Sequence, residues 1–204
     1  MKLFAIIPAA GLSRRMGQPK LTMQLAGRSV ISRLLGALNH PAVAATTVVF
    51  RRSDERLRTE LQQFDVLQVR PEHDPPDMRT SVEHGVATIR ETFAPSEHDA
   101  WLLIPADHPV IDPNVAADLI DAWSACPADI MVPVYQNRRG HPTFFRWSLT
   151  DRLIDIPKDQ GLNWLLKSSD VSIHETPVDS ESVLFDLDTP DDFKRVEQWL
   201  SDVG

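Results

Sequence analysis

Residues 3–20 read LFAIIPAAGLSRRMGQPK, an apolar run followed at once by a loop of small and basic residues. The run over residues 3–8 is short and uniformly apolar, which is typical of a strand buried on both faces of a parallel sheet. The small residues after it let backbone N–H groups approach phosphate oxygens closely. Arg15 and Lys20 add positive charge to this loop. The stretch therefore predicts a central strand that leads into a phosphate-binding loop.

The spacing of the loop matches neither the Walker P-loop nor the dinucleotide-binding fingerprint. A plain solvated turn after a strand has a similar composition, so the loop alone leaves both interpretations open. Two arginines and a lysine in the loop favour the phosphate-binding interpretation.

Strands and helices alternate through the first two thirds of the chain. Strands are expected over residues 46–50, 66–69, 101–105 and 130–134, and helices over 29–38, 54–63, 80–93 and 112–124. Asp54, Thr80 and Asp112 are the expected helix caps. This order predicts right-handed βαβ units and a parallel sheet covered on both faces.

The pattern changes after residue 134. A polar turn at 136–140 is followed by short helices at 147–154 and 162–167, strands at 171–174 and 183–185, and a final helix that begins at Thr189-Pro190. The fold class is therefore expected to be α/β, a three-layer α/β/α Rossmann-like arrangement whose mostly parallel sheet has a small antiparallel extension in the C-terminal half. Residues 1–204 are expected to form a single domain.

Composition and charge exclude several classes of protein. The formal net charge of −8 argues against a nucleic-acid partner bound by phosphate attraction. The single cysteine, Cys126, rules out an intrachain disulfide framework and suits a reducing cytoplasm. The apolar start is too short for a secretory signal, and no apolar stretch is long enough to span a membrane. We therefore expect a cytoplasmic protein with no membrane or nucleic-acid partner.

Two clusters of carboxylates follow predicted strands. Asp107 ends the strand at 101–105, so it shares a sheet edge with the loop after Pro8, where ligands of open α/β sheets bind. A carboxylate there suits Mg²⁺, although Asp107 alone is also a turn-capping residue. Asp186 and Asp188 follow the strand at 183–185, and either is a candidate second ligand. The alternative is that Asp188 or Thr189 only caps the last helix.

These residues together resemble the signature of the MobA-like nucleotidyltransferase superfamily. In the loop the matching residues are Ala9, Ala10, Gly11, Ser13, Arg15, Met16, Gly17 and Lys20. The resemblance continues through residues 79–85, 105–109, 140–143 and 186–192, and so spans nearly the whole chain. The Gly-His-Pro element at 140–142, the Asp-x-Asp-Thr-Pro ending and the Pro-Ala-Ala-Gly loop start look most like the molybdenum cofactor cytidylyltransferase branch.

That branch implies transfer of CMP from CTP to molybdopterin bearing molybdenum, with release of pyrophosphate and a molybdoenzyme as receiver of the product. The acceptor phosphate attacks the α-phosphorus, so the protein supplies positioning and charge neutralisation. The resemblance divides the chain into an NTP-binding half, about 1–110, and an acceptor-binding half, about 111–204. Residues 72–80 differ from the Gly/Ser-richer stretch usual in the branch, which bears on the choice between CTP and GTP.

The resemblance also implies a role for each motif. Lys20, Arg15 and Asp107 are the expected catalytic residues, and Asp107 with Asp188 the expected Mg²⁺ ligands. The expected nucleotide-binding residues are Ala9, Ala10, Gly11, Ser13, Arg15, Lys20, Ser81 and Gly85. His141 and Arg139 are expected to contact the acceptor, the alternatives being a structural turn histidine and a solvated arginine.

Two other functions remain open at this point. One is transfer of GMP or another nucleotide to a different small phosphorylated acceptor, such as a sugar phosphate. The other is a non-catalytic accessory protein that binds a nucleotide or cofactor and releases no pyrophosphate. The Lys20 and Asp107 pair favours an enzyme over a binding protein, which has little need for that arrangement of charge.

Overall fold

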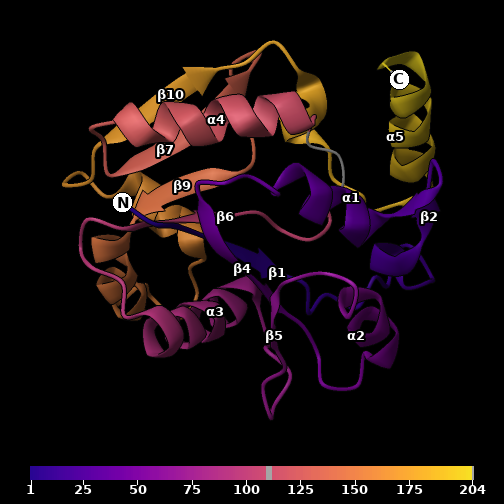
Figure 1. Ribbon diagram of the computed structural model, residues 1–204, viewed down its shortest axis with the longest axis horizontal. Coiled ribbons are helices and arrows are strands. Elements are labelled where there is room, and N and C mark those ends of the chain that lie inside the picture. The colour runs from indigo at the N-terminus through magenta and orange to yellow at the C-terminus, as the bar shows by residue number, and fades with distance from the viewer. Residues whose placement is uncertain (109–111, 204) are drawn as a thin grey trace.

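The computed structural model describes residues 1–108 and 112–203 (Figure 1). In this part of the chain, eight strands form one sheet. They are β1 (Leu3–Pro8), β4 (Val43–Val49), β5 (Leu67–Val69), β6 (Ala100–Leu103), β7 (Ile130–Tyr135), β8 (Arg138–Arg139), β9 (Thr143–Arg146) and β10 (Ile173–Pro177). The strand order is β10-β7-β9-β6-β1-β4-β5, and β8 pairs with β7. A separate hairpin joins β2 (Gln24–Leu25) to β3 (Arg28–Ser29).

The centre of the sheet is parallel, as the alternation of strands and helices predicts. β1 pairs in parallel with β4 on one side and β6 on the other, and β4 pairs in parallel with β5. All six residues of β1 are buried. Parallel strands present their carboxyl ends at one edge, so the loops that follow β1, β4 and β6 lie together there.

The antiparallel part of the sheet is internal. β9 lies between β6 and β7 and runs antiparallel to both, so β7 and its parallel neighbour β10 run in the same direction as β1. The apolar residues Phe144 and Phe145 fit this central position because both are buried. The predicted antiparallel element is therefore present as a strand inserted into the sheet, together with the short β8 at its margin.

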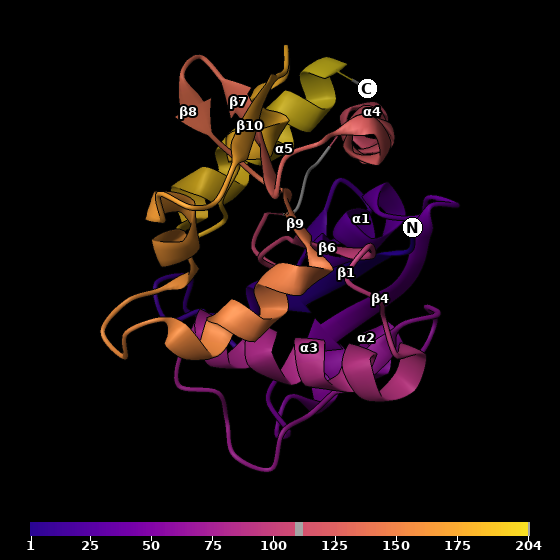
Figure 2. The same ribbon diagram turned by 90° about the vertical axis from the view of Figure 1, so that its left-hand side faces the viewer.

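Helices cover both faces of the sheet, which confirms the α/β architecture (Figure 2). The helices are α1 (Val30–Ala37), α2 (Glu55–Leu61), α3 (Met78–Phe93), α4 (Pro113–Ala125) and α5 (Pro190–Val203), with 3₁₀ helices η1 (Lys20–Thr22), η2 (Trp147–Asp155), η3 (Leu162–Lys167) and η4 (Glu181–Leu184). Leu3, Ala5 and Ile7 pack in one core with α1, α2, α4 and α5. Phe4 and Ile6 point the other way, into a core with α3, η2 and η3.

Two local predictions are wrong. Residues 183–185 belong to η4 and the turn after it instead of a strand, because the Ser180 hydroxyl accepts a hydrogen bond from the Ser182 amide and begins a 3₁₀ turn. Their apolar side chains still enter the core, which explains the misleading pattern. Thr80 is not the cap of α3. Asp77 is, since its carboxylate accepts from the Thr80 amide at 2.7 Å.

The other caps agree with the sequence. Asp54 and Asp112 accept from the Leu57 and Asn114 amides at the starts of α2 and α4. None of the helices in the described residues is long and apolar enough to cross a membrane. The expected boundary near residue 110 lies outside the described residues, so the two-part division of the chain stays a prediction.

Candidate active site

The loop after β1 and the turn after β6 lie side by side at the carboxyl edge of the sheet. The Ala106 amide donates to the Pro8 carbonyl at 3.0 Å, which continues the pairing of β6 with β1 beyond the strand ends. The Ala9 amide donates to the Val49 carbonyl at 2.8 Å on the opposite side. These backbone bonds fix the positions from which Lys20 and Asp107 project.

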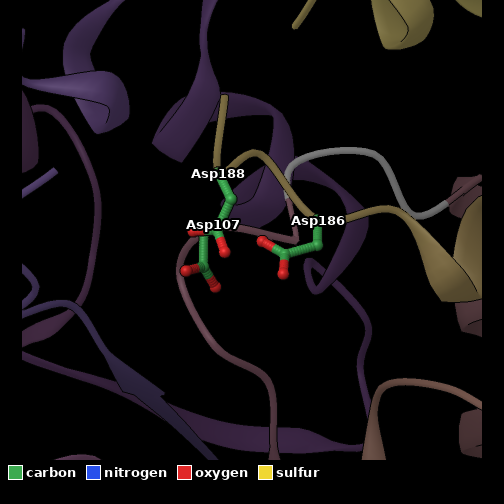
Figure 3. A group of neighbouring side chains, drawn as sticks. All are labelled: Asp107, Asp186 and Asp188. Atoms are coloured by element: carbon green, nitrogen blue, oxygen red, sulfur yellow. The ribbon is translucent and has the colours of Figure 1, made fainter. Parts of the chain in front are cut away.

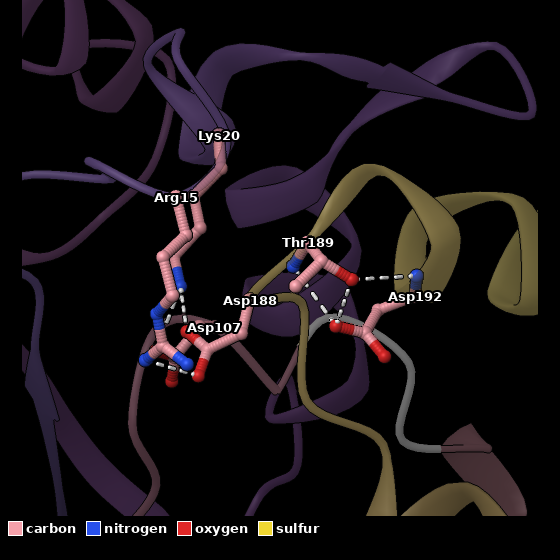
Figure 4. A network of polar contacts seen from close by, with 6 residues as sticks. All are labelled: Arg15, Lys20, Asp107, Asp188, Thr189 and Asp192. Carbon is pink, nitrogen blue, oxygen red and sulfur yellow. Dashed lines mark hydrogen bonds and ion pairs between the residues drawn. The ribbon is translucent and has the colours of Figure 1, made fainter.

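Lys20 joins the loop to two acidic residues that are distant in sequence (Figure 4). Its Nζ lies 3.0 Å from Asp107 Oδ2 and 3.2 Å from Asp188 Oδ1. The Lys20 side chain is only 9% exposed, so its charge needs these partners. The Arg15 guanidinium contacts the other oxygen of Asp188, Oδ2, at 2.6 Å, and its side chain is 71% exposed. The predicted proximity of the basic loop and the two acidic segments is confirmed, and the catalytic roles of these residues stay predictions.

The segment after η4 is held against the turn of Asp107. The Leu187 amide donates to the Asp107 carbonyl at 2.9 Å, and Leu187 itself is buried. On its other side the segment enters α5, where the Thr189 hydroxyl and the Asp192 carboxylate bond each other's backbone amides in a reciprocal cap. Thr189 and Asp192 therefore cap the helix, and Asp188 is left to pair with the basic loop.

Asp107, Asp186 and Asp188 form a cluster of carboxylates (Figure 3). One oxygen from each lies within 4.8 Å of the others, and the three side chains point toward a shared space. Burial, together with the negative charges of Asp107 and Asp188, raises the pKa of Asp186 to about 6, and Lys20 partly opposes these effects. The buried Oδ1 of Asp186 has no hydrogen-bond partner among the described residues. An all-oxygen set with one unsatisfied carboxylate atom fits a hard divalent cation.

The structure brings both candidates for the second metal ligand to the cluster. Asp186 and Asp188 both accompany Asp107, so the alternatives left by the sequence are not exclusive. Asp188 forms ion pairs with Lys20 and Arg15. Asp186 instead has an oxygen, Oδ1, that has no hydrogen-bond partner among the described residues. The sequence could not separate these roles, because the backbone after η4 is irregular and strand alternation does not apply to it.

The phosphate loop has a compact shape that its small residues permit. Ser13 has φ of +48° and Gly17 of +68°, and the Ser13 carbonyl accepts from both the Met16 and Gly17 amides at 3.1 Å. Glycine is favoured at 17 for this reason. Gly11 differs, because an added Cβ would meet no protein atom within 4 Å. No atom of the described residues requires a glycine at position 11, whereas a ligand that approached the backbone closely would.

Two cavities flank the loop. One, of about 180 Å³, is lined by residues from three segments that include Ala10, Gly11, Pro75, Pro76, Asp77, Ser81 and Asp107. The other, of about 340 Å³, lies against Ser13, Arg14 and Arg51. The first one brings Ala10, Gly11 and Ser81 beside the acid cluster, as expected of nucleotide-binding residues. The sequence did not single out Pro75, Pro76 and Asp77 individually, since they belong to an irregular segment before α3.

Gly85 lies elsewhere, and its predicted contact with the nucleotide is not supported. It is buried in α3 at the point where this helix crosses the sheet, and an added Cβ would lie 2.8 Å from Ile6 Cγ2. A glycine is needed there for close helix–sheet packing. Ala9 is likewise buried, and it contributes its backbone to the strand end instead of a surface to the cavity.

The two residues predicted to contact the acceptor, His141 and Arg139, lie in different surroundings. His141 packs against His108 with ring centroids 4.5 Å apart, which places it next to the turn of Asp107. Burial lowers the pKa of His141 to about 3, although the Leu103 backbone opposes this shift, so the ring is neutral. Its buried Nδ1 has no hydrogen-bond partner of good geometry among the described residues. Burial also lowers the pKa of His108. Arg139 instead is on the exposed β8, where its Nε donates to Glu175 Oε1 at 2.8 Å.

A third cavity, of about 430 Å³, contains His141. Its other lining residues include Asp77, Met78, Arg79, Lys158, Gln160 and Asn163. Asp77 and Met78 also line the 180 Å³ cavity, so the two spaces meet at the beginning of α3. Lys158 replaces Arg139 as the basic residue beside His141. Residues 157–161 of this wall form an exposed turn, which has no side-chain pattern that distinguishes it from other turns.

The family of the chain follows from residues 5–173, which match the MobA-like NTP transferase domain. The chain belongs to this family. It is a nucleotidyltransferase, and NTPs are the substrates of the family. Pro109, part of the matching strand-end motif, lies outside the described residues.

Three relatives illustrate the range of the family. The chain is 27% identical over 207 residues to a molybdenum cofactor guanylyltransferase of Rhizobium meliloti (strain 1021), with 96% of this chain and 91% of that protein covered. It is 32% identical over 141 residues to a 2-C-methyl-D-erythritol 4-phosphate cytidylyltransferase of Acidobacterium capsulatum, covering 64% of this chain and 57% of that enzyme.

The third relative is a solved structure, Rv0371c of Mycobacterium tuberculosis H37Rv. It superposes with a TM-score of 0.79 at 23% identity and covers 97% of this chain and 99% of its own. A structure of the same protein in complex with manganese superposes with a TM-score of 0.76 at 21% identity. At this identity these matches establish the shared fold.

Proposed function

We propose that this chain transfers CMP from CTP to the phosphate of molybdopterin bearing molybdenum, in a Mg²⁺-dependent reaction that releases pyrophosphate. The observation that carries the proposal is the convergence of Lys20, Asp107 and Asp188 beside a cavity lined by the phosphate loop. A buried lysine between two carboxylates needs a replacement partner when a cation takes the carboxylates, and a triphosphate supplies one.

Asp107 and Asp188, with Asp186 beside them, are the residues that would hold Mg²⁺. The cation would neutralise phosphate charge at the reacting centre. In the described structure Lys20 and Arg15 already balance part of the acidic charge. If Asp107 and Asp188 held a metal ion, Lys20 and Arg15 would be released from these carboxylates and would pair with the phosphates of the nucleotide, so the charge balance would be kept.

The transfer itself requires positioning and electrostatic stabilisation. An oxygen of the acceptor phosphate forms a bond to the α-phosphorus, the bond from this phosphorus to the β-phosphate bridging oxygen breaks, and pyrophosphate leaves with that oxygen. Lys20 is buried against Asp107, which lines the cavity, and from there it would donate to the α-phosphate as charge develops. Arg15, largely exposed, is free to turn from Asp188 to the β- and γ-phosphates.

The residues that line the 180 Å³ cavity are the basis for proposing a pyrimidine base. Its walls include the rings of Pro75 and Pro76, and Ala10 adds a methyl group where a glycine would leave more room. A single methyl group discriminates weakly between bases, by about tenfold in favourable cases. The proposal of CTP therefore depends on Ala10, Pro75 and Pro76 together reducing the space for the base in this cavity.

The acceptor belongs in the 430 Å³ cavity. It adjoins the nucleotide cavity at Asp77 and Met78, and His141 at its floor is next to the turn of Asp107. The neutral ring of His141 cannot serve as a cation for a phosphate, so its expected contribution is a neutral surface in the wall of the cavity. Lys158 supplies the nearby positive charge. The product would then pass to a molybdoenzyme in the cytoplasm.

A second candidate is transfer of GMP to the same acceptor. It is favoured by the guanylyltransferase relative, whose similarity covers 96% of this chain. The two candidates differ in the nucleotide and share the acceptor.

The deciding experiment incubates the full chain with Mg²⁺, molybdenum cofactor and each NTP in turn, followed by mass analysis of the product and measurement of pyrophosphate. The proposal predicts the cytosine dinucleotide form of the cofactor. The guanine form would establish the second candidate. Pyrophosphate release with a sugar phosphate, but not with molybdenum cofactor, would contradict the acceptor, and NTP binding without pyrophosphate release would indicate an accessory protein.

A further inference from the structure

Arg79 joins the start of α3 to a segment that is distant in sequence. Its Nη1 donates to the carbonyl oxygens of Ile156, at 2.7 Å, and Pro157, at 3.1 Å. Its Nε donates to Glu83 Oε1 at 2.8 Å, one turn along the same helix. The Arg79 side chain is only 20% exposed. The guanidinium is therefore bonded to Glu83 of its own helix on one side and to the backbone carbonyls of Ile156 and Pro157 on the other.

The segment that begins at Pro157 forms a wall of the 430 Å³ cavity proposed for the acceptor. Residues 157–161 are exposed throughout, between the buried side chains of Ile156 and Leu162. Within it the Gln160 amide donates to the Pro157 carbonyl at 2.9 Å, a local turn that does not attach the segment to the rest of the protein. Lys158 and Gln160 of this wall line the cavity. Arg79 thus supplies a contact that fixes the start of the wall to a distant element.

The residues beside Arg79 in the chain line the nucleotide cavity. Asp77 and Met78, directly before Arg79, line both cavities, and Ser81, two residues after it, lines the smaller one. Asp77 also caps α3, so this end of the helix is well ordered by its own hydrogen bonds. The helix start is therefore a rigid reference point from which the acceptor wall can be positioned relative to the nucleotide.

We propose that Arg79 is a positioning residue that holds the acceptor wall, residues 157–161, in register with the nucleotide cavity. This inference rests on the proposed function for the identity of the acceptor. Loss of the two carbonyl contacts frees the wall, weakens acceptor binding and leaves nucleotide binding intact, since the helix cap and the phosphate loop do not depend on Arg79.

The test compares Arg79→Gln with Arg79→Lys and with Glu83→Gln as a matched control. Glu83→Gln disturbs the bond between the two helix side chains but keeps the contacts of Arg79 with the carbonyls. Hydrogen exchange of the peptide over residues 156–163 reports on the wall without any substrate. Steady-state pyrophosphate release with CTP, Mg²⁺ and molybdenum cofactor gives the KM of each substrate and kcat.

In Arg79→Gln, exchange over residues 156–163 is expected to accelerate, and the KM for molybdenum cofactor to rise about tenfold, while the KM for CTP changes by less than about twofold. Arg79→Lys should recover part of the acceptor affinity, and Glu83→Gln should match the wild type. Wild-type exchange in Arg79→Gln, or an equal rise of both KM values, overturns the proposal. The exchange result stands without an acceptor, so it distinguishes failure of this inference from failure of the transfer reaction.

Discussion

The phosphate loop follows β1 and Asp107 follows β6, whereas the wall of the acceptor cavity is an exposed turn held to α3 by Arg79. On the first side, backbone bonds between neighbouring strands continue to within one residue of Asp107. On the second side, the lining residues follow the 3₁₀ helix η2 and a bend without long-range strand pairing.

This difference separates chemistry from specificity. A reacting centre needs charged groups placed to within a fraction of an ångström, and the strand ends provide that placement. A wall built from a turn tolerates changes in length and composition, so different acceptors can be recognised on the same scaffold. Substitutions at the strand ends should therefore reduce turnover, and substitutions at the wall should mainly alter acceptor binding.

The largest expected effect follows loss of Lys20. Lys20→Met should lower kcat by roughly 10²–10³, comparable with removing one oriented donor to developing charge. The measurement is steady-state pyrophosphate release, with folding checked by circular dichroism. Arg14→Met removes the same charge from the same loop and should lower kcat by less than about tenfold. Equal losses in the two variants would mean that overall loop charge, and not the position of Lys20, matters.

Asp107→Asn should reduce activity by about 10² and shift the magnesium titration to higher concentration, because one carboxylate ligand is lost. Asp191→Asn is the control, since Asp191 is 92% exposed in the first turn of α5 and lies outside the carboxylate cluster. An unchanged magnesium midpoint in Asp107→Asn would count against Asp107 as a ligand.

The strand-end side was largely predictable from the sequence, for a physical reason. An apolar run of six residues identifies β1, and the carboxyl ends of parallel strands share one edge, so the meeting of the loop with Asp107 follows from pattern and topology. Asp188 was reached through the resemblance of its motif. The role of Asp186 was not resolvable, because its unpartnered oxygen depends on burial that a local pattern does not report.

The acceptor side was less predictable. Arg139 was chosen because it is a basic residue two positions before His141, yet β8 carries it outward to Glu175. Arg79 was not chosen, because it reaches this cavity through contacts with Ile156 and Pro157, which are 77 and 78 residues away in sequence. Lys158 was not chosen, because it lies on an exposed turn that has no side-chain pattern of its own. Gly85 was assigned to the ligand from its motif, and the close approach of α3 to Ile6 explains it instead.

A smaller effect concerns metal binding without nucleotide. Lys20 Nζ forms ion pairs with Asp107 and Asp188, so it should compete with a metal cation for both carboxylates. Lys20→Met should bind free Mn²⁺ roughly tenfold more tightly than the wild type, measured by calorimetry or by electron paramagnetic resonance. Arg14→Met should leave this affinity unchanged. Weaker Mn²⁺ binding in Lys20→Met would show that Lys20 supports the metal site instead of competing with it.

The smallest expected effect is on stability. Burial and like charge raise the pKa of Asp186 to about 6 in the folded protein, so its neutral form contributes stability that is present below the ordinary aspartate pKa and is lost as pH rises through about 6. Asp186→Asn should therefore raise the Tm of the metal-free protein by roughly 2 °C at pH 8. The gain should disappear near pH 4. Scanning calorimetry in a chelator tests this, and a lower Tm at pH 8 would contradict the charge assignment.

The most direct test of the central claim, that one triphosphate–metal unit joins Lys20 to the acid cluster, is the energetic coupling between magnesium and nucleotide binding. Calorimetric Kd values for CTP, with GTP in parallel, are measured with and without Mg²⁺ for the wild type and for the Asp107→Asn, Asp188→Asn double variant. The account predicts that Mg²⁺ tightens nucleotide binding by at least about tenfold in the wild type and by less than about twofold in the double variant. Full magnesium enhancement in the double variant would contradict it.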